Sequence, residues 1–228
     1  MRTRLARAFY RRTSLPFRVA FMILACLRSR RTPLCLSHDS SDTYLDVHIR
    51  EDFRELWKYG YHRVFDLLAN FSPVSDLASL RVLSIGPRTE IELYYLWLFF
   101  GFSWKNIVGV DIVSPSQKIT LGDMSVRLPF EDNSFDVIVA SHCLEKSRNP
   151  EKTRDEIMRV AKRGARVLIC GDRPPEGVPL FRPTPIPLRF FDGGAYGVVE
   201  LYKLDLRDIE YMNARSPHGF EIIFEVKK

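Results

Sequence analysis

Cysteine is scarce and unpatterned in this 228-residue chain. No two cysteines form a CxxC pair, and none lies at the spacing to histidine that metal sites use. A disulfide framework is therefore excluded, no metal site is predicted, and we expect reduced thiols in a cytoplasmic compartment. The four cysteines are Cys26, Cys35, Cys143 and Cys170.

Long apolar runs are missing from the N-terminal region. Its apolar stretch, Val19–Leu27, has nine residues, whereas a helix needs about 20 to cross a hydrocarbon layer of ~30 Å. The whole chain is 46% hydrophobic and 27% charged, and it has no internal repeat. This composition excludes a disordered or collagen-like protein and supplies enough apolar material for a sizeable core.

Acidic residues and lysine are absent from residues 1–31, which contain nine arginines. The rest of the chain has 28 acidic residues against 25 basic ones. The basic arm predicts an anionic partner for the arm alone. The mildly acidic body argues against a nucleic-acid partner. Three interpretations stay open: a helix packed on the domain with solvated arginines, a helix in peripheral contact with a membrane, and an organelle-targeting presequence.

The remaining pattern divides the chain into two parts. Residues 1–43 are predicted to be the basic arm and a polar linker, and residues 44–228 one domain. Within that domain we expect three regions: an N-terminal helical cap over 44–72, a core over 80–172, and a proline-rich excursion with the last strands over 173–228.

Short apolar runs alternate with helical patterns from residue 80 onward. The alternation predicts an α/β fold with a doubly wound, mostly parallel sheet of seven strands, preceded by N-terminal helices. Most of these runs are continuously apolar, as expected for strands covered on both faces. The predicted helices are Thr89–Phe100 and a helix capped by Asn149 that closes at Gly164. The predicted strands are Leu80–Ile85, Asn106–Asp111, Lys118–Gly122, Phe135–Ser141, Ala165–Cys170, Val198–Leu204 and Phe220–Val226.

Chemically useful residues follow the first two predicted strands. Ligands of open α/β sheets bind at the carboxyl ends of the strands. After the first strand, Gly86 permits a tight turn, and free N–H groups of the next helix, with Arg88, suit an anion. Asp111 ends the second strand and can accept hydrogen bonds from the ribose of a nucleotide-like ligand. The structural alternatives are a plain turn capped by Thr89 and a surface charge at Asp111.

Two further strand ends carry polar groups. After the third strand, Asp123 can accept from an adenine amino group and Met124 can cover a ring face. After the fourth strand, Ser141 and His142 are expected to face a bound ligand. Each signal also fits an ordinary polar loop or a structural histidine. Their order at successive strand ends is more specific than any one of them.

The stretch Val82–Gly171 resembles class I S-adenosylmethionine-dependent methyltransferases. The motifs that carry the resemblance are RVLSIGPRTE, VGVDI, LGDMSVRLPFEDNSFDVIVASHCLE and ARVLICGD. The resemblance implies a Rossmann-like fold and S-adenosyl-L-methionine as cofactor. It assigns the ribose to Asp111 and the methionine part to Gly86. It also places Asp123 and Met124 beside the adenine and Ser141 and His142 on the methyl side, with Asp136 as scaffold.

The first motif departs from the family pattern. Of its usual three glycines only Gly86 remains, and Pro87, Arg88 and Glu90 fill the rest. Arg88 is then expected to bind the carboxylate of the cofactor. The alternative is that cofactor binding was lost and the chain is a catalytically silent scaffold or interaction module, attached to a membrane surface. A nicotinamide-dependent dehydrogenase is disfavoured because GxGxxG is absent.

The predicted reaction is methyl transfer to a small-molecule, lipid or sugar acceptor. His142 is the preferred general base because histidine exchanges protons near neutral pH. Weaker candidates are Glu145, Asp172 and His62. The proline-rich segment 173–187 and the aromatic segment 57–61 are expected to surround the acceptor.

Overall fold

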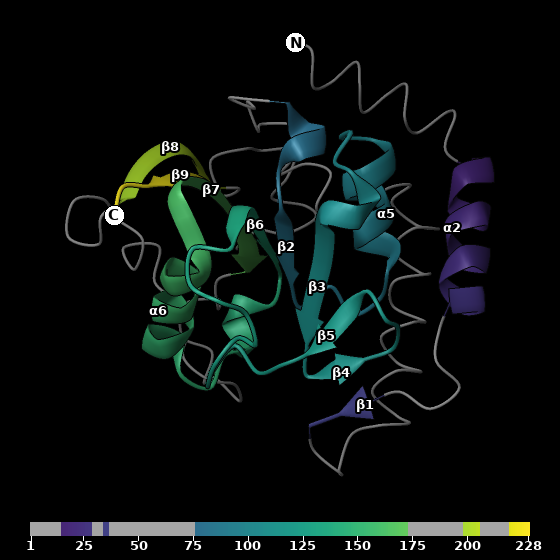
Figure 1. Cartoon of the computed structure of the whole chain (residues 1–228), viewed down its shortest axis with the longest axis horizontal. Coiled ribbons are helices and arrows are strands. Elements are labelled where there is room, and N and C mark those ends of the chain that lie inside the picture. The colour runs from purple at the N-terminus through teal and green to yellow at the C-terminus, as the bar shows by residue number, and fades with distance from the viewer. Residues whose placement is uncertain (1–14, 29–33, 37–75, 173–197, 206–218) are drawn as a thin grey trace.

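The computed structural model describes residues 15–28, 34–36, 76–172, 198–205 and 219–228 (Figure 1). Its helices are α2 (Leu15–Arg28), α5 (Ile91–Leu98) and α6 (Pro150–Val160), with short turns η1 (Leu77–Ser79), η2 (Trp104–Asn106) and η3 (Leu144–Lys146). Its strands are β1 (Leu34–Cys35), β2 (Val82–Ile85), β3 (Ile107–Asp111), β4 (Val113–Ser114), β5 (Ile119–Leu121), β6 (Phe135–Ser141), β7 (Ala161–Asp172), β8 (Val198–Asp205) and β9 (Gly219–Val226).

The main sheet has seven strands in the order β5-β3-β2-β6-β7-β9-β8. The first five pair in parallel, whereas β9 is antiparallel to both β7 and β8. The predicted doubly wound, mostly parallel fold is therefore confirmed. The chain runs outward from β2 to β3 and β5, then returns to β6 on the other side of β2. This reversal is the switch point at which open α/β sheets bind ligands.

Two hydrophobic cores lie on opposite faces of the sheet. Alternate side chains of a strand point to opposite faces. Accordingly Val82 belongs to the cluster that contains α5, and Leu83 to the cluster that contains Ile157 of α6. Double coverage explains why most of the parallel strands are apolar without alternation.

The predicted end of the helix after Asn149 is wrong. The Asn149 side chain caps the helix by accepting from Lys152 N at 3.0 Å, as predicted, but α6 ends at Val160. The chain enters β7 at Ala161, where the register with β6 is irregular and Gly164 has a φ of 80°. A glycine in this conformation marks either a helix end or a bulge, and here it lies in the bulge.

Part of the predicted linker is a strand. Leu34 and Cys35 in β1 pair antiparallel with β4, and Leu36 N donates to Ile112 O at 3.1 Å. Two residues are too short to give a periodic signal, so sequence alone could not reveal this pairing. The division at residue 43 stays a prediction.

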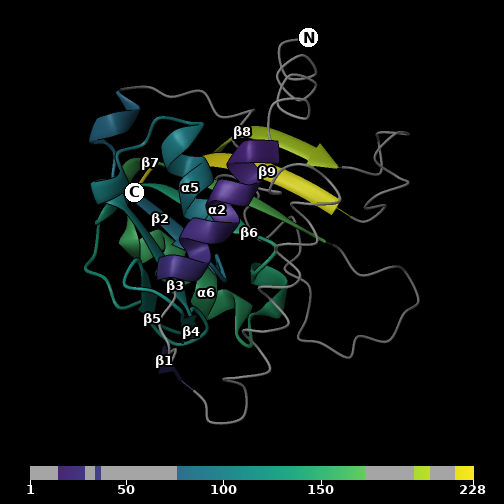
Figure 2. The ribbon, with the colours of Figure 1, turned by 90° about the vertical axis from the view of Figure 1, so that its right-hand side faces the viewer.

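Helix α2 packs against α5, on the side of the molecule away from β8 and β9 (Figures 1 and 2). No helix in the described ranges is long and apolar enough to span a membrane. The predicted cap over 44–72, with His62, and the proline-rich segment 173–187 lie outside the described residues.

Candidate active site

A cavity of about 400 Å³ lies at the carboxyl ends of β2, β3, β5 and β6. This size suits a small-molecule cofactor. It takes side chains from the four strand ends that the sequence singled out, and from β1 as well. The lining residues are Leu36, Ile85, Gly86, Arg88, Val110, Asp111, Ile112, Gly122, Asp123, Met124, Ser125, His142, Cys143, Lys146 and Arg148.

At Gly86 the backbone after β2 passes very close to the backbone after β6. Its φ is 68°, and a Cβ added to it would lie 2.5 Å from Cys143 Cβ. Cys143 is buried at this position, with its Sγ donating to Ile85 O at 3.0 Å. A larger residue at position 86 would therefore push the two loops apart and reshape the cavity.

Arg88 adopts the left-handed backbone conformation that favours glycine, with a φ of 59°. Its N–H donates to Asp111 Oδ2 at 3.1 Å, which ties the first turn to the end of β3. The preceding Pro87 packs over Gly109, where an added Cβ would lie 2.9 Å from Pro87 Cγ. The loop thus keeps a glycine-type backbone although glycine has been replaced. A non-glycine residue in this region costs about 1–3 kcal/mol, and such strain gathers at functional sites.

Several backbone N–H groups of this turn are used within the protein, which leaves fewer of them for the anion expected from the sequence. Besides Arg88 N, the occupied groups are Gly86 N to Val110 O, Thr89 N to Pro87 O and Ile91 N to Thr89 Oγ1. Glu90 and Glu92 also place two carboxyl groups at the start of α5. Arg88 is the cationic residue of this turn that lines the cavity, so its guanidinium is the group of the turn best suited to an anion there.

Asp111 lies at the edge of the cavity and is 7% exposed. Its Oδ2 accepts from Arg88 N, and its Oδ1 accepts from Val113 N at 3.4 Å. The backbone N–H of Ile112 also bonds this carboxylate. A carboxylate has about four lone-pair sites, so at least one remains for a hydroxyl of a ligand. Burial raises the pKa of Asp111, and the N–H of Arg88 acts against that rise.

Asp123 and Met124 line the cavity as predicted, but Asp123 has a cationic partner that the sequence did not reveal. Asp123 Oδ1 accepts from Ser125 N at 2.8 Å, and its Oδ2 binds the Arg148 guanidinium. Arg148 is 25 residues from Asp123 and follows no motif. A ligand amino group at Asp123 would share the carboxylate with Arg148.

Of the two site residues predicted after β6, only His142 lines the cavity. Ser141 is 8% exposed and does not line the cavity, because its Oγ faces β7 and accepts from Cys170 Sγ at 3.3 Å. His142 does line the cavity, with a φ of 50° and its N–H donating to Cys170 O at 2.8 Å. Three non-glycine residues in the described ranges have positive φ, and two of them, Arg88 and His142, line this cavity. The side chains of Glu145 and Asp172 lie outside the described structure.

Sequence reasoning missed the apolar edge of the cavity. Leu36 and Ile112 are joined by a backbone hydrogen bond and are 53% and 38% exposed. Ile112 directly follows Asp111 and could have been found from that position. Leu36 could not, because only the β1–β4 pairing brings it there. Together they offer a flat ring an apolar surface beside Asp111.

Comparisons with known proteins agree with this geometry. The family described as "Methyltransferase domain" matches residues 83–169. A demethylmenaquinone methyltransferase of Clavibacter sepedonicus is 34% identical over 193 residues, covering 78% of this chain and 69% of the relative. One from Streptomyces griseus is 38% identical over 106 residues, covering 46% of this chain and 45% of the relative. The solved SAM-dependent methyltransferase of Aquifex aeolicus shares the fold, with a TM-score of 0.53, 14% identity, and coverage of 80% of this chain and 98% of that one.

A switch-point cavity with an acidic residue at the end of β3 defines a nucleotide-cofactor enzyme of the α/β class. The chain belongs to the class I S-adenosylmethionine-dependent methyltransferases, and S-adenosylmethionine (SAM) is its cofactor. The residues present fit that group. The cavity is open, Gly86 lines it without a side chain, and Asp111 lies at its edge with hydrogen-bonding capacity left. A filled site, which the scaffold alternative requires, is not found among the described residues.

The Arg88→Gly variant separates the two roles of this position. Glycine relieves the left-handed strain, so the variant is expected to be at least as stable as the parent in thermal unfolding. It also removes the guanidinium, so SAM affinity by calorimetry is expected to fall about tenfold or more.

Asn133→Gly is the matched control for Arg88→Gly. Its φ is 53° and it does not line the cavity, so Asn133→Gly relieves the same strain away from the site and loses one exposed hydrogen bond from Lys228 Nζ. Tighter SAM binding by Arg88→Gly would show that the guanidinium is no ligand of the cofactor.

Proposed function

We propose that this enzyme methylates a small quinone-type ring. The observation that best supports this proposal is the 34% identity, over 78% of the chain, to a protein named demethylmenaquinone methyltransferase. A ring acceptor of this kind is lipophilic, as the lipid option of the sequence prediction expected. Two relatives with the same name, from different genera, support one acceptor class.

In this proposal each cavity residue contacts a different part of the cofactor. Asp111 accepts from the ribose hydroxyls, and Asp123 and Met124 contact the adenine. Gly86 leaves room for the methionine part, and Arg88 pairs with its carboxylate. These groups fix position and orientation, which can supply roughly 7–11 kcal/mol of the barrier.

SAM supplies a methyl group bound to a sulfonium sulfur. The acceptor attacks the methyl carbon in line with the carbon–sulfur bond, and the sulfur leaves as a neutral thioether. The acceptor must lose one proton for each methyl group it gains. His142 lies at the cavity with its backbone held to β7, and its imidazole accepts that proton, from a hydroxyl or a ring carbon of the reduced quinone.

A lipophilic acceptor also suits the peripheral membrane contact predicted for residues 1–31. We place the enzyme on a cytoplasmic membrane face, in keeping with Cys35, Cys143 and Cys170, which are not joined in disulfides.

The direct test is a methylation assay with SAM and a short-chain demethylmenaquinol analogue in detergent. We expect stoichiometric formation of S-adenosylhomocysteine and of the ring-methylated product, measured by mass spectrometry. A matched analogue whose reactive ring position is already methylated should give neither. SAM binding without turnover of the first analogue would overturn the acceptor assignment and leave the methyltransferase class intact.

A further inference from the structure

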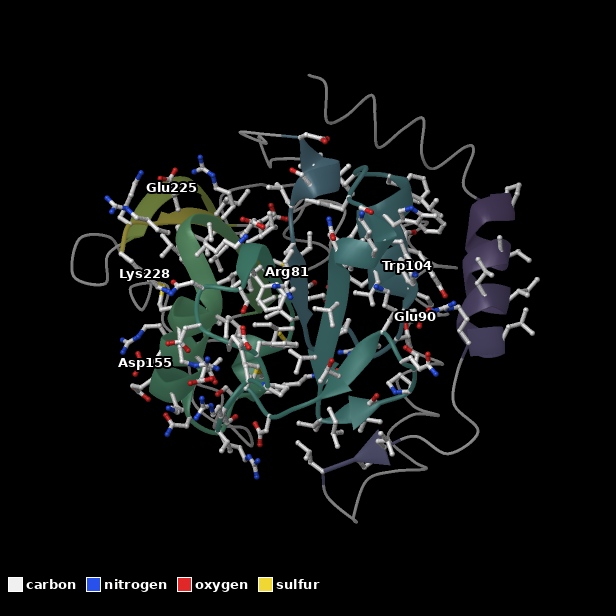
Figure 3. All side chains as sticks on the ribbon, viewed as in Figure 1. Arg81, Glu90, Trp104, Asp155, Glu225 and Lys228 are labelled. Carbon is white, nitrogen blue, oxygen red and sulfur yellow. The ribbon has the colours of Figure 1, made fainter. Side chains whose placement is uncertain are left out.

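Helix α2 exposes a continuous apolar face. Val19, Ile23 and Leu27 follow one another at four-residue steps, and their exposed fractions are 44%, 53% and 76%. Residues spaced in this way lie on the same side of a helix. Several of the side chains drawn on α2 in Figure 3 point away from the rest of the molecule. We call Val19, Ile23 and Leu27 the α2 face.

The C-terminal end of α2 is fastened to the enzyme. Arg28 Nε donates to Glu90 Oε2 at 2.6 Å, and Glu90 is 3% exposed. Tyr94 OH donates to the same oxygen at 2.6 Å, and the Arg28 guanidinium lies 5.4 Å from the centre of the Trp104 ring. Removing Arg28 would leave a buried carboxylate without its cation, which is costly. Arg28 therefore makes α2 part of the folded body and directs the α2 face outward.

The shape of α2 suits the surface of a bilayer. Its 14 residues span about 21 Å at ~1.5 Å per residue, which is too short to cross a ~30 Å hydrocarbon layer. A short helix whose outward side chains are apolar can lie in the plane of the interface with those side chains among the acyl chains.

The charge of the surrounding segment selects the lipid. Residues 1–31 carry nine arginines and no acidic residue, whereas the rest of the chain is mildly acidic. Each basic residue near an anionic membrane surface contributes attraction that salt weakens. We propose that the α2 face docks this enzyme on an anionic lipid bilayer, with Arg28 linking the docked helix to the loop that leads from β2 into α5. The inference rests on the proposed function only in that a lipophilic acceptor is reached from the bilayer.

The test is co-sedimentation of the full chain with phosphatidylcholine vesicles, with and without phosphatidylglycerol. We expect binding to the anionic vesicles only, weakened by salt. The variant Ile23→Asp/Leu27→Asp should bind at least about tenfold more weakly, since each large aliphatic side chain that leaves water contributes roughly a tenfold factor or more. Val126→Asp is the matched control, because Val126 is 60% exposed and belongs to another element, and it should bind like the parent.

A second variant and a second measurement keep the test decisive. Ile23→Ser/Leu27→Ser removes the apolar contact without adding charge and should also weaken binding. Both double variants should keep the parent's SAM affinity in vesicle-free solution, which shows that they fold and separates this inference from the proposed function. Equal vesicle binding by parent and double variants overturns the proposal. So does a parent that forms dimers through the α2 face and ignores vesicles, as sedimentation velocity would reveal.

Discussion

The Asp111→Ala variant is expected to bind SAM at least about a hundredfold more weakly than the parent. In the role proposed for Asp111, the substitution removes charge-assisted hydrogen bonds to the ribose hydroxyls, each contributing about 1.5–3 kcal/mol, and about 1.4 kcal/mol corresponds to a factor of ten. It also releases Arg88 N, which now donates to Asp111 at 3.1 Å and ties the first turn to β3. Isothermal titration calorimetry measures the loss.

Two variants control the Asp111 experiment. Asp111→Asn keeps an acceptor oxygen for the Arg88 N–H and loses the charge, so it should fold like the parent and show a smaller loss of affinity. Asp155→Ala removes a carboxylate of α6 that is 58% exposed and pairs with Arg154 (Figure 3), and it should leave the affinity unchanged. Unchanged affinity in Asp111→Ala and Asp111→Asn together would refute the ribose role.

The pH dependence of SAM binding follows from the burial of Asp111. In the proposed role, hydrogen bonds from the ribose hydroxyls need the ionised carboxylate, and burial raises the pKa of this carboxyl above its ordinary value. As pH falls through the raised pKa, the carboxyl gains a proton and accepts fewer hydrogen bonds. SAM affinity should therefore begin to fall at a higher pH than an exposed aspartate would cause. In Asp111→Asn this acid-side decline should be smaller.

The sequence predicted four residues that line the cavity, because the end of a strand can be recognised from the residues next to it in the chain. Gly86, Asp111, Asp123 and His142 each follow an apolar run, and a parallel sheet brings the ends of such runs to one edge. Their meeting at one cavity therefore needed only the strand order. Ser141 failed because period-two alternation turns neighbouring residues to opposite sides, and the chain bends at His142 with a φ of 50°.

The parts that the sequence did not predict depend on contacts distant along the chain. The partnership of Arg148 with Asp123 and the place of Leu36 beside Ile112 follow from loop packing. The anion site at the start of α5 was predicted from a general property of helix ends. It stays a prediction, and the structure adds competitors for the anion, because the turn uses several of its own N–H groups and Glu90 and Glu92 lie there. Such competition for hydrogen bonds is visible only in the folded chain.

The His142→Ala variant is expected to lower the turnover number about a hundredfold or more, while its SAM affinity stays near that of the parent. A positioned general base contributes roughly 10²–10⁴-fold to rate, and the assigned role of His142 is to take the acceptor's proton. His142 is a cavity residue that directly follows β6, the strand next to β2, and its proposed contact is with the acceptor, so its loss should affect chemistry more than the binding of the cofactor. Turnover with the demethylmenaquinol analogue and calorimetry with SAM measure the two quantities separately.

Backbone strain at position 142 decides which control is informative. Alanine tolerates a φ of 50° poorly, whereas asparagine enters the left-handed region more readily. His142→Asn should therefore keep the parent's melting temperature and still lose turnover, because an amide does not accept a proton as an imidazole does. Asn133→Ala, at a φ of 53° outside the cavity, should lose stability without losing turnover at temperatures where it is folded. Full turnover in a folded His142→Asn enzyme would assign the proton transfer to another group or to solvent, and would leave His142 with a structural role at the turn after β6.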